Sequence, residues 1–339
     1  MTTITILAGG VGGARFTRGL LAHLRTADPS ASVTVVANTG DDLWLAGLRV
    51  CPDLDSIMYT LGDANDDERG WGRKGESERV SAELAAYGVG WPWFTLGDLD
   101  LGTHIARSAW LREGIPLSEA TARLAARWNL GVSLLPATDD EVETIVTVAA
   151  DEADQGDADA TSPAEHMHFE EWWVRLRASR PALAFTQRNV EASRPAPGVL
   201  EAIADADVVM FAPSNPVVSI GTVLGIPGIA DAVRSTPAPV VGVSPIIGGG
   251  VVRGMADACL SAIGVETSAL AVAQHYGARS DGGLIDGWLV DEVDAEAVAL
   301  LEAGGIRSAA RPLWFSSVEE TGAIAAAALA LADVGHSGG

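Results

Sequence analysis

Four acidic side chains follow one β-branched run and could bind a divalent cation. Asp41 and Asp42 stand in Asn38-Thr39-Gly40-Asp41-Asp42, directly after the run 33–37, and Asp53 and Asp55 stand in Pro52-Asp53-Leu54-Asp55. Carboxylate oxygens are the ligands that Mg²⁺ prefers. We predict a Mg²⁺ site formed by Asp41, Asp42 and Asp55, in which Asp42 or Asp55 also orients or deprotonates a hydroxyl group. The alternative is structural: Asp41 caps a turn and Asp53 caps the next helix.

A glycine-rich loop, Gly9-Gly10-Val11-Gly12-Gly13, follows the first apolar run and precedes a helical pattern. Backbone N–H groups at such a helix start bind phosphate, and glycine allows the ligand to approach closely. We predict phosphate binding by Gly9, Gly10, Gly12 and Gly13; the alternative is a tight turn without a ligand. The loop is a poor dinucleotide fingerprint, because Arg15 replaces its third glycine and Asn38 replaces the acidic ribose ligand. A nicotinamide-dependent oxidoreductase is therefore disfavoured.

Two further polar loops follow apolar runs. Ser214 and Asn215 come after the run 208–212, and Ser244 and Gly248 come after the run 239–243. Both loops offer hydroxyl, amide and backbone groups that suit phosphate, guanine or ribose, although Ser214 and Asn215 also suit the cap of the next helix.

The segment Leu96-Gly97-Asp98-Leu99-Asp100-Leu101-Gly102-Thr103-His104 contains a histidine near a helix start. His104 is either an acid–base group or a structural hydrogen-bonding residue. The nearby Trp71, Trp91 and Trp93 either form a wall for an aromatic ligand or pack in the core.

Elements that position these residues are predicted from the apolar runs themselves. The runs 3–7, 33–37, 208–212 and 239–243 are continuous and rich in β-branched residues, as in buried parallel strands. The sequence therefore predicts an α/β fold: a Rossmann-like, doubly wound, mostly parallel sheet. Because ligands bind at the carboxyl edge of such a sheet, we expect the four polar loops to converge on one crevice.

The domain organisation follows from the helical patterns. Residues 63–132 read mainly as helices and are too long for a simple crossover, so we predict a helical insertion subdomain between core segments 1–62 and 133–333. The acidic stretch 151–165 is predicted to be a mobile loop between two pairing strands, 142–149 and 167–175. The tail 334–339 is predicted to be disordered.

Composition limits the partners. The chain of 339 residues has a net charge of −23 and 48% hydrophobic residues. Its negative field disfavours nucleic acid and anionic membranes. Lys74 is the only lysine, so no Gly-x-x-x-x-Gly-Lys phosphate loop exists. Without a signal segment, a membrane-length apolar run or paired cysteines, we expect a cytoplasmic protein.

With these motifs assembled, the chain resembles the 2-phospho-L-lactate transferase family (CofD/FbiA) of coenzyme F-420 biosynthesis, from Gly9 to about Trp288. The separated motifs that carry the resemblance are GGVGGAR, NTGDDLW, CPDLDSIMYTLG, ERGWGRKGES, LGDLDLGTHIAR, HFEEWWV, APSNPVVSIGTVL and VSPIIGGG. The GGVGGAR loop is similar to the actinobacterial phosphoenolpyruvate transferase branch, whereas archaeal relatives have a GGTGTPK type.

The resemblance implies a Mg²⁺-dependent transfer from a guanosine diphosphate donor, which carries a phosphoenolpyruvyl or 2-phospho-L-lactyl group. The acceptor is the ribityl hydroxyl of the deazaflavin Fo, and the second product is GMP. It places Asp55 and Thr95 on the deazaflavin side, although archaeal relatives have a basic residue where Thr95 stands. We predict that His104 binds the deazaflavin as well. The resemblance implies that the glycine loop, with Gly9, Gly10, Gly12 and Gly13, and the Ser214-Asn215 loop face the donor. We also predict that Asn38, Ser244 and Gly248 bind the donor.

Besides the disfavoured oxidoreductase, one alternative function remains. A nucleotide-sugar-binding regulator of the same fold would share the glycine loop without catalysing a reaction, but it would lack the PDLD and LGDLDLGTH motifs. We also expect a homodimer, because dimers are common among soluble enzymes of this kind.

Overall fold

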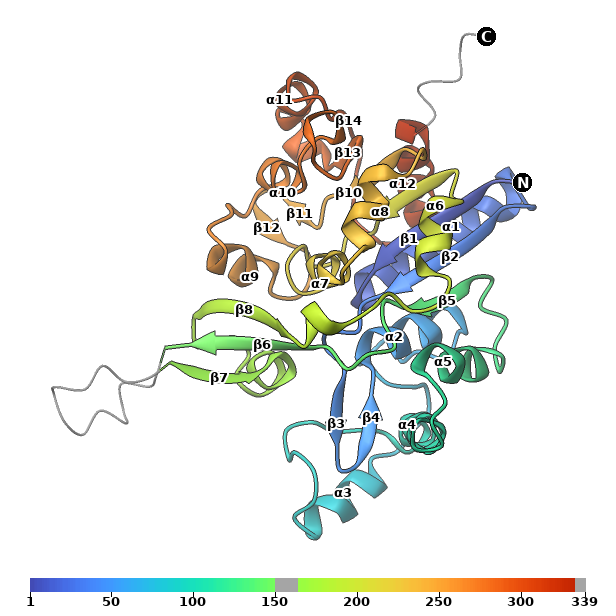
Figure 1. Cartoon of the computed structure of the whole chain (residues 1–339), viewed down its shortest axis with the longest axis vertical. Coiled ribbons are helices and arrows are strands. Elements are labelled where there is room, and N and C mark those ends of the chain that lie inside the picture. The colour runs from blue at the N-terminus through green and yellow to red at the C-terminus, as the bar shows by residue number, and fades with distance from the viewer. Residues whose placement is uncertain (150–163, 333–339) are drawn as a thin grey trace, which may run out of the picture.

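A seven-stranded parallel sheet forms the centre of the computed structural model, which describes residues 1–149 and 164–332 (Figure 1). The α/β, Rossmann-like prediction is confirmed. Neighbouring strands pair in parallel throughout. Their order across the sheet is β14 (Arg307–Ala310), β13 (Gly287–Val290), β10 (Val240–Val243), β9 (Val208–Phe211), β1 (Thr3–Ala8), β2 (Ser32–Ala37) and β5 (Ser133–Pro136).

Helices cover both faces of the sheet because its strands are apolar on both sides. In β1, Ile4 and Ile6 face one core and Leu7 faces the other. The first core is covered by α1 (Gly10–Ala27), α2 (Pro52–Leu61), α5 (Leu117–Ala125) and α12 (Val318–Ala332). The second is covered by α6 (Val199–Ala204), α7 (Ile220–Gly225), α8 (Ile229–Ser235), α9 (Ala256–Ala262), α10 (Ala269–Tyr276) and α11 (Ala297–Ala303).

The four strands predicted from apolar runs are adjacent, in the order β10-β9-β1-β2. The chain runs from β1 to β2 in one direction across the sheet and from β9 to β10 in the other, so the strand order reverses between β1 and β9. A doubly wound sheet binds ligands at such a point. The glycine loop follows β1 and the Ser214 loop follows β9, and the two therefore flank this position.

A three-stranded antiparallel sheet lies beside the main sheet and consists of β7 (Glu165–His168), β6 (Glu143–Val148) and β8 (Ala182–Arg188) (Figure 1). The predicted pairing of the strands around the acidic stretch is confirmed, but the second strand was placed too far along the chain. Residues Glu171–Arg175 form a π-helical turn, η2, and Glu165, predicted to lie in the mobile loop, begins β7. The rest of that loop and the tail 334–339 fall outside the described residues, apart from Ala164.

The predicted insertion, residues 63–132, contains α3 (Arg79–Ala86), α4 (Asp98–Arg112) and α5. A small apolar cluster joins Leu96 and Leu101 to the hairpin of β3 (Leu43–Leu45) and β4 (Leu48–Val50). This contact places the start of α4 beside the polar loops that follow β2. The remaining short elements are β11 (Ile246–Ile247), β12 (Gly250–Val251), η3 (Val190–Ala192), η4 (Arg279–Asp281) and η5 (Glu292–Asp294).

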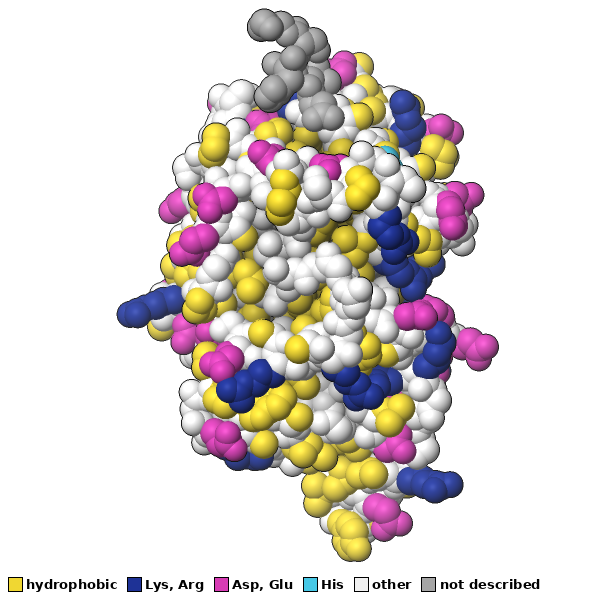
Figure 2. Space-filling model, turned by 90° about the vertical axis from the view of Figure 1, so that its right-hand side faces the viewer, with side chains coloured by type: hydrophobic (Ala, Val, Ile, Leu, Met, Phe, Trp, Pro, Cys, Tyr) yellow, Lys and Arg dark blue, Asp and Glu magenta, His cyan; other side chains and the backbone are white. Residues whose placement is uncertain are grey.

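Acidic and basic side chains are interspersed on the face that Figure 2 shows, and backbone and apolar atoms fill its middle. The negative net charge is therefore not gathered into one patch on that face. Within the part of the chain that the structure describes, none of the helices is both long and apolar enough to span a bilayer.

Candidate active site

A cavity of about 790 Å³ lies at the carboxyl edge of the sheet. Its volume lies within the range of small-molecule sites. All four predicted loops contribute to its lining, together with the start of α4. The predicted site residues that line it are Gly9, Gly10, Gly12, Asp41, Asp55, Thr95, His104, Ser214, Asn215 and Ser244. The sequence prediction that these loops converge on one crevice is confirmed.

The glycine loop packs directly against the loop that follows β9. Ser214 Oγ accepts a hydrogen bond from Gly9 N (3.0 Å) and donates one to Gly9 O (2.7 Å). A Cβ atom on Gly12 would lie 2.8 Å from Pro213 O, and one on Gly13 would lie 3.0 Å from Ser214 Oγ. Glycine at these two positions therefore allows the two loops to meet, while Gly10 and Gly12 border the cavity.

Several predicted donor-binding groups already have partners within the protein. Asn215 Oδ1 accepts hydrogen bonds from Val217 N (2.9 Å) and Val218 N (3.3 Å). Ser244 Oγ accepts one from Ile246 N (3.1 Å). Gly248 N donates to Asp294 Oδ2 (2.9 Å), and neither Gly248 nor Gly13 is among the residues that line the cavity. These side chains shape the loops around the site.

Asn38 joins two of the carboxylates that line the cavity, Asp41 and Asp53. Its Nδ2 donates to Asp41 Oδ2 (3.1 Å) and to Asp53 Oδ2 (2.9 Å), while its Oδ1 accepts from Gly40 N (2.9 Å). Asn38 is fully buried and does not line the cavity. Its amide therefore fixes the positions of two acidic groups that do.

Burial raises the pKa of both carboxyl groups. The pKa of Asp53 rises to about 6 through burial, against the hydrogen bond from Asn38. The pKa of Asp41 also rises, first because of burial and then because of the neighbouring Asp53 charge. Among the residues that the structure describes, Asp41 Oδ1 is buried without a hydrogen-bond partner. Two acidic groups that repel each other beside an unpartnered oxygen form an environment that a cation would stabilise.

Glu170 adds a third carboxyl group to this side of the cavity. It precedes η2 and is buried, with 7% of its surface exposed. Burial and the charge of Asp53 raise its pKa to about 8. The Glu170 carboxyl group is therefore mostly protonated near neutral pH unless a cation binds beside it.

Asp42 lies apart from the cavity. It does not line the cavity, it is fully buried, and its Oδ2 lies 3.7 Å from Arg49 Nη2. Burial raises its pKa to about 7, although the Arg49 charge opposes the shift. The consecutive residues Asp41 and Asp42 therefore face different surroundings.

Asp55 lines the cavity and is paired with a buried arginine. Arg107 Nη1 donates to Asp55 Oδ2 (3.0 Å), and Arg107 Nη2 donates to Asp55 Oδ1. Burial alone would lower the pKa of Arg107, but the Asp55 charge raises it overall. Both Asp55 oxygens are therefore paired with a permanent cation, which reduces the need of this carboxylate for a metal ion.

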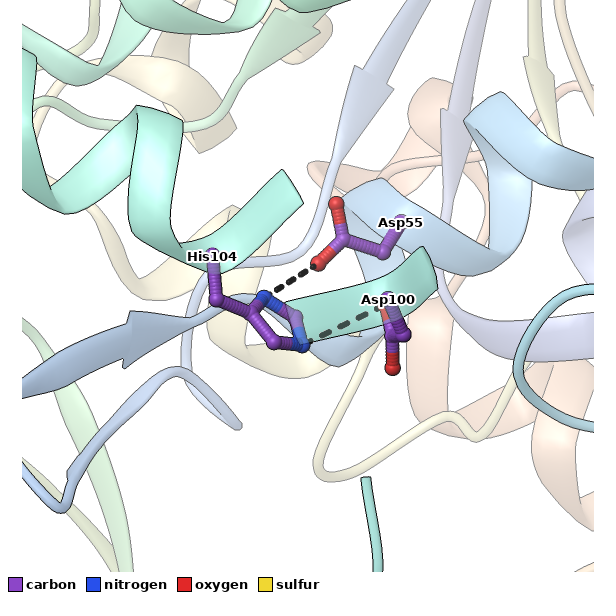
Figure 3. A group of neighbouring side chains, drawn as sticks. All are labelled: Asp55, Asp100 and His104. Atoms are coloured by element: carbon purple, nitrogen blue, oxygen red, sulfur yellow. Dashed lines mark ion pairs between the residues drawn. The ribbon is translucent and has the colours of Figure 1, made fainter. Parts of the chain in front are cut away.

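His104 lies between Asp55 and a second carboxylate (Figure 3). Its Nδ1 is 3.5 Å from Asp55 Oδ2, and its Nε2 is 3.2 Å from Asp100 Oδ1. Tyr59 Oη donates to Asp100 Oδ1 (2.6 Å). Burial alone would raise the pKa of Asp100, but His104 lowers it overall. Asp55, Asp100 and His104 have ligand atoms within 4.8 Å of one another, which also makes them a candidate metal group.

Aromatic side chains line the cavity near this network. Trp93 and Trp71 both line it, and Trp71 is 41% exposed with Arg69 over its ring at 3.9 Å. Trp91 does not line it but stacks on Trp93, with ring centroids 4.7 Å apart. Thr95, which is half-buried, follows these residues along the chain. This wall provides flat apolar surface for a conjugated ring.

Asp100, Glu170 and Arg107 had no role in the sequence prediction. Asp100 and His104 are four residues apart on one helix, a spacing that places both side chains on one face and could have revealed Asp100. Arg107 follows His104 by three residues on the same helix. Glu170 had no such signal, because its position depends on the antiparallel sheet.

The fold and the cavity together define an α/β enzyme with a phosphate-type glycine loop, carboxylates and an aromatic wall at the switch point of the sheet. The family model described as 2-phospho-L-lactate transferase CofD matches residues 4–309. The chain belongs to this family and is a transferase of coenzyme F-420 biosynthesis.

Curated relatives agree with this assignment over nearly the whole chain. A phosphoenolpyruvate transferase from Streptomyces griseus is 55% identical over 330 residues, which cover 97% of this chain and 98% of that protein. One from Thermobifida fusca is 55% identical over 333 residues, covering 97% of each. One from Streptomyces coelicolor is 54% identical over 330 residues, covering 97% and 98%.

A solved structure supports the fold. A UPF0052-family protein from Bacillus halodurans superposes with a TM-score of 0.59 at 17% identity, covering 97% of this chain and 98% of that one. At this level of identity the likeness concerns the architecture only.

Proposed function

We propose that the protein transfers a phosphoenolpyruvyl group from enolpyruvyl-diphospho-5'-guanosine to the terminal ribityl hydroxyl of the deazaflavin Fo. The products are dehydro coenzyme F-420-0 and GMP. The observation that carries the proposal is that one cavity contains both the glycine loop with Asp41 and Asp53 and the network of Asp55, Asp100 and His104. A donor and an acceptor can therefore meet within a single cavity.

The choice of the enolpyruvyl donor over the 2-phospho-L-lactyl donor rests on the relatives. Those that share about half of their residues with this chain are named phosphoenolpyruvate transferases. The geometry of the cavity agrees equally with both donors, because they differ only in the saturation of a three-carbon acid.

The donor diphosphate fits the glycine-loop side of the cavity. Gly10 and Gly12 border it at the start of α1, where backbone N–H groups and the helix dipole favour negative charge. Ser214 keeps the loop in place through both of its hydrogen bonds to Gly9. The rigid amide groups therefore need no rearrangement as charge develops on the leaving phosphate.

A magnesium ion fits best beside Asp41 and Asp53. Asp41 Oδ1 lacks a hydrogen-bond partner within residues 1–149 and 164–332, and burial raises the pKa of both carboxyl groups. Asp55 fits less well because Arg107 already neutralises it, and Asp42 lies outside the cavity lining. We therefore assign the metal to Asp41 and Asp53, in place of the predicted set Asp41, Asp42 and Asp55. When bound there, Mg²⁺ would withdraw charge from a diphosphate.

Asp55 is the group that we assign to the acceptor hydroxyl. The hydroxyl oxygen attacks the phosphorus that bears the enolpyruvyl group, and the bond from that phosphorus to the bridging oxygen of the diphosphate breaks. The bridging oxygen leaves with GMP, and the hydroxyl proton passes to the Asp55 carboxylate. Arg107 and His104 hold this carboxylate in place from within the protein. The deazaflavin ring then has Trp71 and Trp93 as its wall.

The protein is proposed to work on these small molecules in the cytoplasm as a homodimer, without nucleic acid or membrane partners. The net charge of −23 supports the exclusion of polyanionic partners. Sedimentation equilibrium of the purified protein tests the dimer; a single species of 35.0 kDa would contradict it.

One assay tests the reaction. Purified protein, Fo and Mg²⁺ are incubated with each of the two guanosine donors, and the product masses and GMP are measured. We expect dehydro coenzyme F-420-0 and equimolar GMP from the enolpyruvyl donor. Exclusive use of the lactyl donor would overturn the choice of donor. Tight binding of donor and Fo without any transfer would favour the non-catalytic regulator.

A further inference from the structure

Cations are scarce in the cavity although the proposed donor is anionic. The carboxylic residues that line it are Asp41, Asp53, Asp55, Asp100 and Glu170. Among its described lining residues, the permanently charged cations are Arg15 and Arg253. Neither belongs to any of the ion pairs found within the described ranges 1–149 and 164–332. Both guanidinium groups are therefore available to an anionic ligand.

Arg15 belongs to the phosphate end of the cavity. It lies on α1 shortly after the glycine loop, and its Nη2 donates to Phe315 O (2.8 Å). This contact holds the guanidinium group at the side of the cavity where the backbone amides of the loop lie.

Arg253 lies where the two sides of the cavity meet. It follows β12 on the loop after Ser244, and its Nη2 donates to Gly70 O (3.3 Å), 183 residues away in sequence. Gly70 precedes Trp71, which belongs to the aromatic wall, and both line the cavity. Arg253, which is exposed, therefore connects the loop that follows the β11–β12 hairpin to the segment that carries the acceptor wall.

A group that moves from donor to acceptor must sit between their sites. In the proposed reaction this group is a phosphoenolpyruvyl moiety, whose second charged group, besides the phosphate, is a carboxylate. We propose that Arg253 binds this carboxylate and thereby selects donors that carry an acid on the transferred group. The inference rests on the proposed function. Arg253 is a positioning and specificity residue and takes no part in bond making.

Chemistry favours arginine for this task. The planar guanidinium group presents two parallel N–H donors that match the two oxygens of a carboxylate. Its present partner is a single neutral carbonyl at 3.3 Å, a contact that a charged ligand can replace. The diphosphate has the glycine loop and Arg15 at its own end, which leaves Arg253 for the carboxylate.

The test compares how strongly the wild type and an Arg253 variant bind donors with and without the carboxylate. Calorimetry measures the affinity of the wild type and of Arg253→Ala for the enolpyruvyl donor and for its carboxamide analogue, with GMP as a ligand that lacks the transferred group. Loss of a charge-assisted pair corresponds to roughly 10- to 100-fold in affinity. We expect the affinity of Arg253→Ala for the enolpyruvyl donor to fall by roughly this 10- to 100-fold. Its affinity for the carboxamide analogue should fall little, and its affinity for GMP should equal that of the wild type.

Arg253→Lys should recover only part of the affinity, because lysine keeps the charge without the fork. Arg25→Ala is the matched control: Arg25 is exposed in the last turn of α1, at the end remote from the glycine loop. Equal losses of acid and carboxamide binding in Arg253→Ala, or no loss of either, would overturn the proposal. If the two proteins show all the expected differences in binding but the wild type transfers no group, the proposed reaction is overturned and the role of Arg253 is supported.

Discussion

Arg107 binds both oxygens of the Asp55 carboxylate, although 52 residues separate them in the chain. Arg107 comes from α4, in the predicted insertion, and Asp55 comes from α2, which packs on the sheet. The arginine is fully enclosed, with 1% of its surface exposed. This pair therefore ties the predicted insertion to the core at the edge of the cavity.

Removal of Arg107 should cost more stability than removal of a surface arginine. Arg107→Ala leaves a buried carboxylate without its partner, and such a loss typically costs about 3–5 kcal/mol. Arg234→Ala breaks the exposed pair with Asp231 and should cost at most about 1 kcal/mol. Urea denaturation of the three proteins measures the free energies of unfolding, and equal losses in the two variants would contradict the buried pairing.

Asp55→Asn should remove most of the turnover. The amide accepts no proton from the acceptor hydroxyl, so we expect kcat to fall roughly 100- to 10,000-fold. Because Asp55→Asn also leaves the buried Arg107 without its counter-charge, it should lose stability, so kcat is compared at a temperature at which circular dichroism shows the variant to be folded. Asp63→Asn, at a position whose side chain is 88% exposed, is the control and should retain full activity. Near-normal turnover of Asp55→Asn at saturating Mg²⁺ would refute the assigned role.

Metal affinity should distinguish the neighbouring aspartates. Asp41→Asn and Asp53→Asn should each raise the Mg²⁺ concentration for half-maximal activity by roughly 10- to 100-fold, because each removes a charge from the cavity. Asp42→Asn should leave this concentration nearly unchanged, since Asp42 faces Arg49. Titration of activity with Mg²⁺ gives the three values. If Asp42→Asn raises this Mg²⁺ concentration more than Asp41→Asn does, the metal site predicted from the sequence, which includes Asp42, is supported instead.

The central strands were predictable because each is a continuous apolar run. β9 and β10 are buried at every residue, so every residue in them has to suit an apolar core, and this makes the runs recognisable in the sequence. The edge strand β14 reads Arg-Ser-Ala-Ala and carries no such signal. It pairs because β13 beside it is buried on both faces, which is a tertiary effect.

The choice among acidic residues could not be made from the sequence. Asp53 and Asp55 stand two residues apart in α2, so their side chains point in nearly opposite directions around the helix. One therefore meets Asn38 and the glycine loop, and the other meets Arg107. A sequence places both near the sheet edge but does not give the rotation of the helix.

Gly12→Ala should weaken donor binding without unfolding the protein. The new Cβ would lie 2.8 Å from Pro213 O, a backbone atom, so the two loops must separate. Such overpacking costs about 1–3 kcal/mol, and we expect the affinity for GDP to fall roughly tenfold or more. Gly102→Ala in α4 meets open space and should stabilise the helix by about 0.5–1 kcal/mol. Unchanged GDP affinity in Gly12→Ala would contradict the close contact of the loops.

Glu170 should make the metal-free protein less stable as the pH rises. Burial and Asp53 raise the pKa of Glu170 from 4.5 to about 8, so the folded state holds its proton more tightly than the unfolded state. The stabilisation from this group is complete below pH 4.5 and is lost as the pH rises toward 8. Within this window the wild type should lose up to about 1.4 kcal/mol per pH unit relative to Glu170→Gln.

Denaturation of both proteins in the presence of a chelator, from pH 5 to pH 8, measures the difference in slope between them. Mg²⁺ should reduce that difference, because a bound cation stabilises the ionised carboxylates around it. Glu191→Gln, an exposed change of the same chemistry, should leave the wild-type slope unaltered. Parallel pH profiles for the wild type and Glu170→Gln would show that Glu170 is ionised in the folded protein and would remove it from the acidic group beside Asp53.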